Sequence, residues 1–155
     1  MGMTVEGIDE AMAVLYQSGE RVTRGLVGKM RHEAEAIQKL AQQYAPLDHG
    51  NLEEAIKIET LGGGRDSRGR FVRKAFEVFI DMNARGYKGE PISQYAYEMH
   101  ELLLPYGAGG FNLGPQSRQK DGGRGVVGGR FLERAVDEVS KDMMNRLTQV
   151  AASYF

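Results

Sequence analysis

The stretch Ala45-Pro46-Leu47-Asp48-His49-Gly50-Asn51-Leu52 separates two patterns of hydrophobic residues and so decides how the chain folds. Pro46 disfavours a helical conformation at Ala45, while Asp48 and Gly50 are residues that favour turns. A helix that arrives from the N-terminal side must therefore end here, and the chain must reverse. The structural turn over residues 45–52 is predicted to depend on Pro46, Leu47, Asp48, Gly50 and Leu52.

The roles expected in this turn follow from residue type. Asp48 is expected to cap the turn, and Gly50 to adopt a positive φ. Leu47 and Leu52 are expected to anchor the turn to the core. All of these roles are structural, and Gly50→Val would accordingly abolish soluble folded protein.

Upstream of the turn, apolar residues recur every three or four positions, which is the period of a helix with one buried face. This pattern predicts a helical segment over residues 5–44. An unbroken helix of that length would be about 60 Å long, too long for one 155-residue globule to cover. We therefore expect a break near Ser18-Gly19, rather than at Gly25 or Gly28, unless another subunit covers part of the helix.

Downstream of the turn, the period changes to two. Ile56, Ile58 and Thr60 alternate with charged residues, and a second alternating run extends over residues 76–82. Alternation of this kind is typical of half-buried strands. The two runs are predicted to be the arms of a long hairpin over residues 53–82.

The C-terminal part of the chain returns to helical patterns. A short helix is expected over residues 93–104, ended by Pro105. Residues 105–129 contain nine glycines and little apolar content, so we expect a loop that is mobile or ordered by a partner. An amphipathic helix is predicted over residues 130–152. The element order predicts a single α+β domain over residues 1–155, with long N-terminal and C-terminal helices packed on a small antiparallel sheet.

Composition excludes several classes of protein. The net charge of −1 argues against a surface built entirely for nucleic acid. The absence of cysteine excludes disulfides and thiolate metal sites. No stretch approaches the ~20 apolar residues of a membrane span, and the acidic N-terminal residues differ from a signal peptide. We expect a chain made in the cytoplasm, without a membrane partner.

Motifs that carry catalysis are weak in this sequence. Residues 123–128 match the G-x-G-x-x-G pattern of nucleotide-binding loops, but no strand precedes them and too few residues follow for the second strand. His32, His49 and His100 lack a recognised zinc spacing. No G-x-S-x-G element is present. The sequence therefore offers no positive case for an enzyme, and no cofactor is expected.

Carboxylates on the predicted helices mostly lie beside basic residues. Glu33 and Glu35, for example, are close in sequence to Arg31 and Lys39. Such pairs on a helix surface are usually solvated and contribute little to stability. We expect both glutamates to be solvated in this way.

The strongest polar feature is the tip of the predicted hairpin. Its five positive charges stand against the single negative charge of Asp66, a net charge of +4. Three interpretations remain open: a solvated turn that keeps an exposed strand from aggregating, a contact with a protein partner, or a contact with DNA phosphates that cannot read bases. We call this set the basic tip, and it consists of Arg65, Arg68, Arg70, Arg73 and Lys74.

Residues 44–52, followed by Ala55-Ile56 at the start of a strand, resemble the A-P-x-D-x-G-x-L-x-x-[SA]-I signature of a protein family of tailed double-stranded DNA bacteriophages. These are the tail-completion, or tail-component, proteins of the head-tail junction. Tyr95-Ala96-Tyr97-Glu98-Met99 is similar to the family's Y-A-x-x-[VM]-E region, with its Glu one place early. Residues 129–135 are similar to the R-P-F-L-x-P-A that opens the final helix, without its two prolines. The usual Glu-x-Gly-Thr after the tyrosine region is also missing.

The resemblance, which spans about residues 36–150, implies a structural virion protein without catalysis. It implies a six-fold ring, a hexamer, at the neck at the top of the tail, assembled in the host cytoplasm. Helix faces and the hairpin would make head-to-tail contacts that close the ring. The glycine-rich loop would order against the connector or head-closure protein above, or the tail terminator or tail tube below. The inter-subunit loop residues would be Tyr106, Phe111, Arg118, Lys120, Arg124 and Arg130.

Two alternatives remain beside this interpretation. The chain could instead be a head-closure or tail-terminator protein, which would use the same surfaces at another level of the neck. It could also be a non-catalytic DNA-binding module that uses the basic tip. In the ring, nonspecific contact with genomic DNA in the lumen is also expected.

Overall fold

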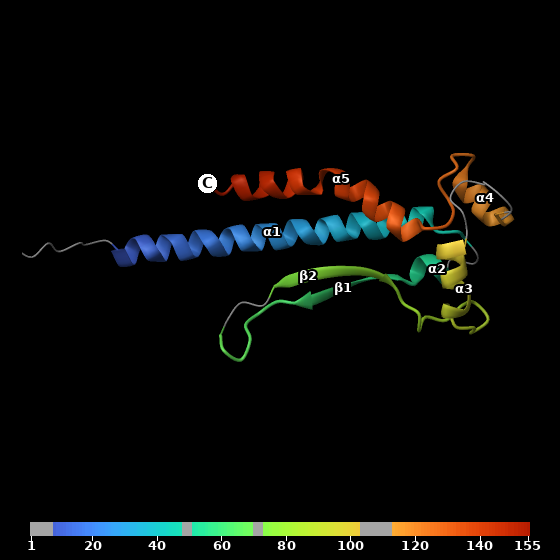
Figure 1. Cartoon of the computed structure of the whole chain (residues 1–155), viewed down its shortest axis with the longest axis horizontal. Coiled ribbons are helices and arrows are strands. Elements are labelled where there is room, and N and C mark those ends of the chain that lie inside the picture. Colours follow the sequence, from blue (N-terminus) through green and yellow to red (C-terminus); the bar gives the residue numbers. More distant parts are fainter. Residues whose placement is uncertain (1–7, 48–50, 70–72, 103–112) are drawn as a thin grey trace, which may run out of the picture.

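A computed structural model of the chain describes residues 8–47, 51–69, 73–102 and 113–155. It has the predicted α+β architecture (Figure 1). The elements, in chain order, are α1 (Ile8–Tyr44), α2 (Asn51–Glu54), β1 (Ile56–Gly62), β2 (Lys74–Ile80), α3 (Ser93–Tyr97), the π-helical turn η1 (Glu98–Leu102), α4 (Pro115–Asp121) and α5 (Phe131–Ala152).

Helix α1 is continuous over its 37 residues, which gives it a length of about 55 Å. The predicted break near Ser18-Gly19 is therefore wrong. Glycine lowers helix propensity by only ~1 kcal/mol relative to alanine, and unlike proline it keeps its backbone N–H. Gly25 also lies against the ring of Tyr154, so the end of α5 packs on the middle of α1.

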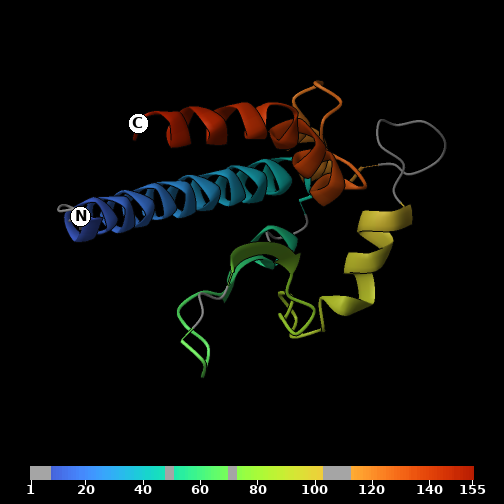
Figure 2. The ribbon, with the colours of Figure 1, turned by 60° about the vertical axis from the view of Figure 1, so that its left-hand side comes forward.

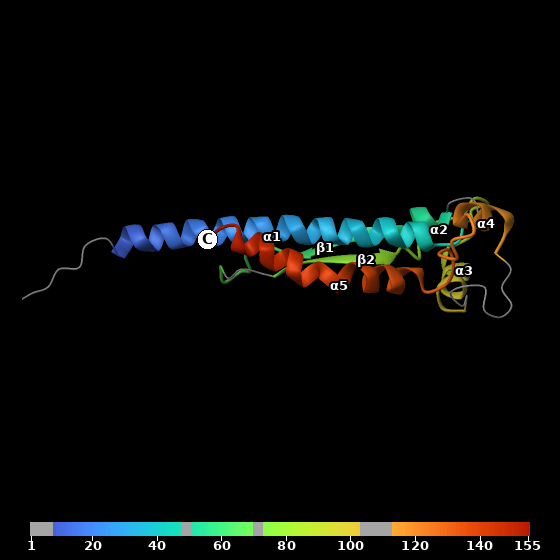
Figure 3. The same cartoon turned by 90° about the horizontal axis from the view of Figure 1, so that it is seen from above.

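Helix α1 lies between the other two long elements. Helix α5 starts at the C-terminal end of α1 and runs back antiparallel to it, while the hairpin of β1 and β2 follows the opposite side of α1 (Figures 1 and 2). The view from above shows the first turns of α1 extending past the end of α5 (Figure 3). The C-terminal helix thus packs on α1, and α1 in turn packs on the sheet.

The hairpin is an antiparallel two-stranded sheet with the predicted alternation. Ile56 is fully buried, and Ile58, Val78 and Ile80 are half-buried on the same face. The opposite face carries mostly exposed residues. The paired residues are Ile56 with Ile80, Lys57 with Phe79, Ile58 with Val78, Glu59 with Glu77, Thr60 with Phe76, Leu61 with Ala75 and Gly62 with Lys74.

The core is small and lies at one end of the molecule. Among the described residues, the large side chains that are fully buried are Phe131, Ile56 and Ile92. We call this end the base (residues 40–47, 51–56, 84–102 and 113–135) and the other end the distal end (residues 14–32, 59–69, 73–77 and 147–155). The buried cluster of the base consists of Ala41, Ala45, Leu52, Ala55, Ile56, Ile92, Ala96, Phe131 and Ala135.

Two predicted boundaries need correction. The predicted glycine-rich loop contains α4, which begins at Pro115 and ends before Gly122. Proline at the first helical position and glycine in the left-handed conformation after the last are ordinary helix-end signals. The hairpin begins at Ile56, because the short helix α2 occupies the start of its predicted range. Residues 103–112, which include Pro105, lie outside the described residues.

In the described ranges, no helix combines the length and the apolar character needed to cross a membrane.

Candidate interaction surfaces

The turn after α1 is held by helix α4. The backbone N–H of Leu47 donates to Ser117 Oγ at 2.9 Å, and Ser117 Oγ donates to the carbonyl oxygen of Leu47 at 3.1 Å. Pro46 and Leu52 are buried. Leu52 is part of the buried cluster of the core, and Leu47 is held through its backbone. Asp48 and Gly50 lie outside the described residues.

Lys120 closes the C-terminal end of α1. Its Nζ donates to the carbonyl oxygens of Gln42 at 2.5 Å and Ala45 at 2.7 Å, and it forms an ion pair with the Glu53 carboxylate. The last carbonyl groups of a helix lack partners within the helix, and a cation there also complements the helix dipole. Lys120, which was predicted to contact another subunit, thus stabilises the fold of its own chain.

The G-x-G-x-x-G segment binds a carboxylate of the same chain. Asp121 accepts hydrogen bonds from the backbone N–H groups of Gly125 at 2.7 Å, Val126 at 2.6 Å and Val127 at 2.9 Å. These bonds, led by the one from Val127, lower the pKa of Asp121. Successive amides of this kind can hold an anion. Here the anion is Asp121, so these amides are already occupied.

The rest of the glycine-rich segment is also tied to the base. Gly128 donates its backbone N–H to Tyr44 O at 2.9 Å, and Arg130 donates its own to His100 O at 2.6 Å. Arg130 also pairs with Glu133 at 2.7 Å. Residues 113–130 are therefore held by contacts within their own chain, contrary to the expectation that this loop is mobile or ordered by a partner, although the residues outside α4 are irregular as predicted. Of the other predicted inter-subunit residues, Arg118 and Arg124 are exposed, while Tyr106 and Phe111 lie outside the described residues.

A buried ion-pair network joins α1 to α5. Glu33 is 4% exposed, and Arg146 binds its carboxylate through Nε at 2.9 Å and Nη2 at 2.5 Å. Lys29 Nζ lies 3.1 Å from the same carboxylate. The hydrogen bonds from Arg146 are the main cause that lowers the pKa of Glu33 to about 2. The prediction of a solvated Glu33 is wrong, because its main partner lies 113 residues away in sequence.

The neighbouring glutamate follows the prediction. Glu35 pairs with Arg31 at 3.1 Å, and the Arg31 side chain is largely exposed. The Nδ1 atom of His32 lies 3.4 Å from the same carboxylate, on an exposed imidazole ring. This group is a solvated surface pair of the expected kind.

The basic tip lies at the distal end, away from the core (Figures 1 and 2). Arg65, Arg68, Arg73 and Lys74 are exposed, and Arg70 lies outside the described residues. The turn is held from within, because Arg65 donates to Gly69 O at 2.9 Å and Asp66 Oδ1 accepts from the backbone N–H of Arg68 at 2.9 Å. The tip therefore presents a defined group of cations to the surroundings.

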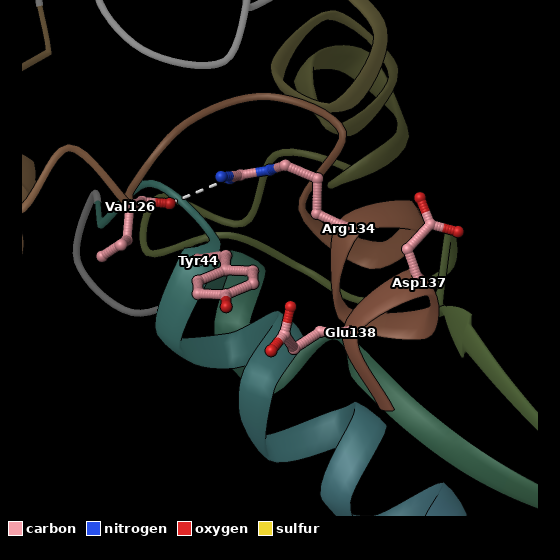
Figure 4. Close-up of a pocket in the computed structure, with 5 residues that line it drawn as sticks. All are labelled: Tyr44, Val126, Arg134, Asp137 and Glu138. Atoms are coloured by element: carbon pink, nitrogen blue, oxygen red, sulfur yellow. Dashed lines mark hydrogen bonds between the residues drawn. The ribbon is translucent and has the colours of Figure 1, made fainter. Parts of the chain in front are cut away.

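A shallow pocket of about 230 Å³ lies at the base, between α5 and the end of α1. Figure 4 shows Arg134 reaching past the Tyr44 ring toward Val126, with Glu138 pointing toward Tyr44 and Asp137 at the rim. The guanidinium carbon of Arg134 lies 4.8 Å from the Tyr44 ring centroid, and Nη2 donates to Val126 O at 2.9 Å. We call this site the acceptor pocket, lined by Tyr44, Val126, Arg134, Asp137 and Glu138.

Sequence reasoning did not find the acceptor pocket, Glu33 or the carboxylate–amide contact of Asp121. Each is assembled from segments far apart in sequence or depends on the conformation of a loop. Across the part of the chain that the structure describes, no group of three or more His, Cys, Asp or Glu side chains could hold a metal ion.

No family model matches the chain, no curated protein matches its sequence, and no solved structure matches its fold. The resemblance to the phage tail-completion family therefore depends on the quoted motifs alone.

Proposed function

We propose that this protein is a structural subunit of a bacteriophage neck, one copy in a ring that joins the portal connector to the tail. The observation that carries the proposal is the small core of the described residues, in which Phe131, Ile56 and Ile92 are the largest side chains that are fully buried. A core of this size buries little apolar surface for a chain of 155 residues. A subunit of this kind is suited to an assembly in which neighbours cover part of its surface.

The composition of the core supports the same proposal. Among the described residues, six of the eleven buried hydrophobic residues are alanines. Alanine side chains bury little apolar area, so they contribute little to the hydrophobic free energy of folding. At the distal end, Val14 is 62% exposed and Tyr16 is 70% exposed on α1. These apolar side chains are candidates for burial against another subunit.

The location of the three motif stretches also fits a structural role. Each stretch contributes buried residues to the core. These are Leu52 of the first stretch, Ala96 of the second, and Phe131 and Ala135 of the third. All three stretches therefore meet in the base, where their shared property is packing. Because the motif residues named here are buried in the core, they support a structural role for the motifs.

Light scattering coupled to size exclusion tests the ring directly. We expect six copies of the 17.2 kDa chain, a species of about 103 kDa, in the purified protein or after addition of connector. Mass spectrometry of purified virions and immunogold labelling would then locate the chain at the neck. A chain that stays monomeric with connector and is absent from virions would overturn the proposal.

A DNA-binding module is the second candidate, and the exposed cations of the basic tip favour it. Binding through phosphates would weaken steeply with added salt. Titration of duplex DNA into the wild type and into Arg68→Glu/Arg73→Glu, at low and physiological salt, measures this. Equal affinity of the two proteins for DNA would dispose of this candidate. A head-closure or tail-terminator role would be distinguished by which neck protein the ring binds.

A further inference from the structure

We propose that the described cations of the basic tip, Arg65, Arg68, Arg73 and Lys74, bind the acceptor pocket on the next copy of the same chain. This inference rests on the proposed ring, because it names the contact that would hold neighbouring subunits together. It commits to a second copy of this chain as the partner of both surfaces.

The chemistry of the tip suits such a contact. Arg68 and Arg73 are exposed, and within the ranges that the structure describes their guanidinium groups have no hydrogen-bond or ion-pair partner. A guanidinium is planar and can donate two parallel hydrogen bonds to a carboxylate. Asp66 is already bonded to the backbone of the turn, so it orders the tip while the arginines remain available.

The chemistry of the acceptor pocket is complementary. Arg134, the cation of the pocket, directs its hydrogen bonds to the carbonyl oxygens of Val126 and Gly129. The carboxylate of Asp137 forms no hydrogen bond or ion pair among the described residues and interacts with Lys141 through charge alone, while that of Glu138 pairs with the exposed Lys141 at 2.8 Å. Arg134 already lies over the Tyr44 ring, so the pocket offers an additional guanidinium the Glu138 carboxylate beside the ring and the Asp137 carboxylate at the rim (Figure 4).

The charges of the two surfaces also match. The described part of the basic tip has four cations against Asp66, a net charge of +3. The acceptor pocket and the exposed positions of α5 beside it carry Asp137, Glu138 and Asp142 against Arg134 and Lys141, a net charge of −1. A chain with a net charge of only −1 has thus separated its charges into opposite patches. Complementary patches guide association and fix its register, and an acidic surface of this kind would repel DNA.

The positions of the two surfaces determine the kind of assembly. The hairpin and α5 lie on opposite sides of α1, with the tip toward the distal end and the pocket at the base (Figures 1 and 2). The tip therefore cannot reach the pocket of its own chain. A contact between two different surfaces is head-to-tail, and repeated head-to-tail contacts give a ring when the rotation closes.

A charge swap tests the contact in the full chain. The tip variant is Arg68→Glu/Arg73→Glu, and the pocket variant is Asp137→Arg/Glu138→Arg. The control is Arg21→Glu/Arg24→Glu, at two exposed positions of α1.

Light scattering should show a ring for the wild type and the control. It should show a 17.2 kDa monomer for the tip variant and for the pocket variant. An equimolar mixture of tip and pocket variants should recover a ring of alternating subunits, because the two new glutamates of one tip then meet a basic pocket, and the unchanged arginines of the other tip meet an unchanged pocket. Circular dichroism melting checks that every variant is folded.

A second measurement covers weak association. The chain has no cysteine, so Arg68→Cys/Asp137→Cys treated with a bis-maleimide should give a ladder of covalent multimers, and Arg24→Cys/Asp137→Cys should not. Rings that survive both charge variants, or the absence of a specific ladder, would overturn this inference. The ring itself would still stand if it forms in the wild type or the chain is found in virions. Rings unaffected by the tip variant, together with lost DNA binding, would assign the tip to nucleic acid.

Discussion

The base and the distal end of this protein are built in different ways. In the base, large apolar side chains are fully buried and charged groups such as Lys120 and Asp121 bind backbone atoms of neighbouring segments. At the distal end, the final residue Phe155 is 96% exposed and Tyr16 is 70% exposed. The difference teaches that folding free energy is concentrated in the base, which leaves the distal end free to contact partners. Variants that affect stability and variants that affect assembly should therefore be separable.

The largest effect is expected from truncation of the centre of the base. Phe131 is fully buried and packs edge-on against His100, with ring centroids 4.9 Å apart. Phe131→Ala should cost ~3–5 kcal/mol through lost burial and the remaining cavity. Tyr16→Ala at the distal end should change the free energy of unfolding by less than ~0.5 kcal/mol. Urea unfolding measures both, and equal effects would refute the contrast between the two ends.

The ion pair at the boundary between the two ends should have the next largest effect. The pKa of Glu33 is about 2 in the folded chain, against an ordinary value of 4.5. This lowering contributes up to ~3 kcal/mol to stability at neutral pH. Because the folded pKa is the lower one, the contribution is complete above pH 4.5 and is lost as the pH falls toward 2. Glu33→Gln should therefore be clearly destabilised at pH 7.

The pH dependence distinguishes this ion pair from simple packing. The difference in unfolding free energy between the wild type and Glu33→Gln should narrow as the pH falls from 5 to 3. Glu35→Gln, on the exposed surface pair, is the matched control and should have little effect at any pH. A difference that stays constant with pH would mean that Glu33 contributes through packing alone.

A smaller and more local effect is expected at the glycine-rich loop. The Asp121 carboxylate accepts hydrogen bonds from three backbone N–H groups. In Asp121→Asn, one of its two oxygens is replaced by an NH₂ group, which cannot accept them. Leaving part of this set unsatisfied should cost ~1–3 kcal/mol. Asp142→Asn, at an exposed position of α5, should change the free energy of unfolding by less than ~0.5 kcal/mol. Hydrogen exchange should show faster exchange at residues 125–127 only in the first variant.

Local periodicity was sufficient to predict the two strands, the C-terminal end of α1 and both ends of α5 to within one residue. The alternating runs that contain Ile56 and Ile58 and residues 76–82 form the two strands, but their register is known only from the structure. Helix α4 was missed because its docking residues are polar: Ser117 and Lys120 contact positions at least 67 residues earlier in the chain. A seven-residue helix held in this way shows no hydrophobic period. The acceptor pocket was missed because Tyr44 and α5 are far apart in sequence and meet only in the folded chain.

The wrong prediction at Gly19 leads to the smallest and most discriminating test. Gly19 lies inside α1, and apart from the neighbouring backbone of its own helix no atom of the described residues lies within 4 Å of the position that a Cβ would occupy. In a continuous helix, Gly19→Ala should stabilise the protein by ~0.5–1 kcal/mol. Gly25→Ala is the matched control, because its Cβ would overlap the Tyr154 ring and displace the end of α5.

The measurement that detects this gain in stability depends on whether the distal end and the base unfold together. If the distal end of α1 unfolds together with the base, Gly19→Ala should raise the urea midpoint. If it unfolds separately, the gain should instead appear as higher helical circular dichroism before the main transition. Both results require a continuous helix at Gly19. A variant that gains neither would restore the break near Ser18-Gly19, and the first turns of α1 would then be a separate unit that a neighbouring subunit must hold.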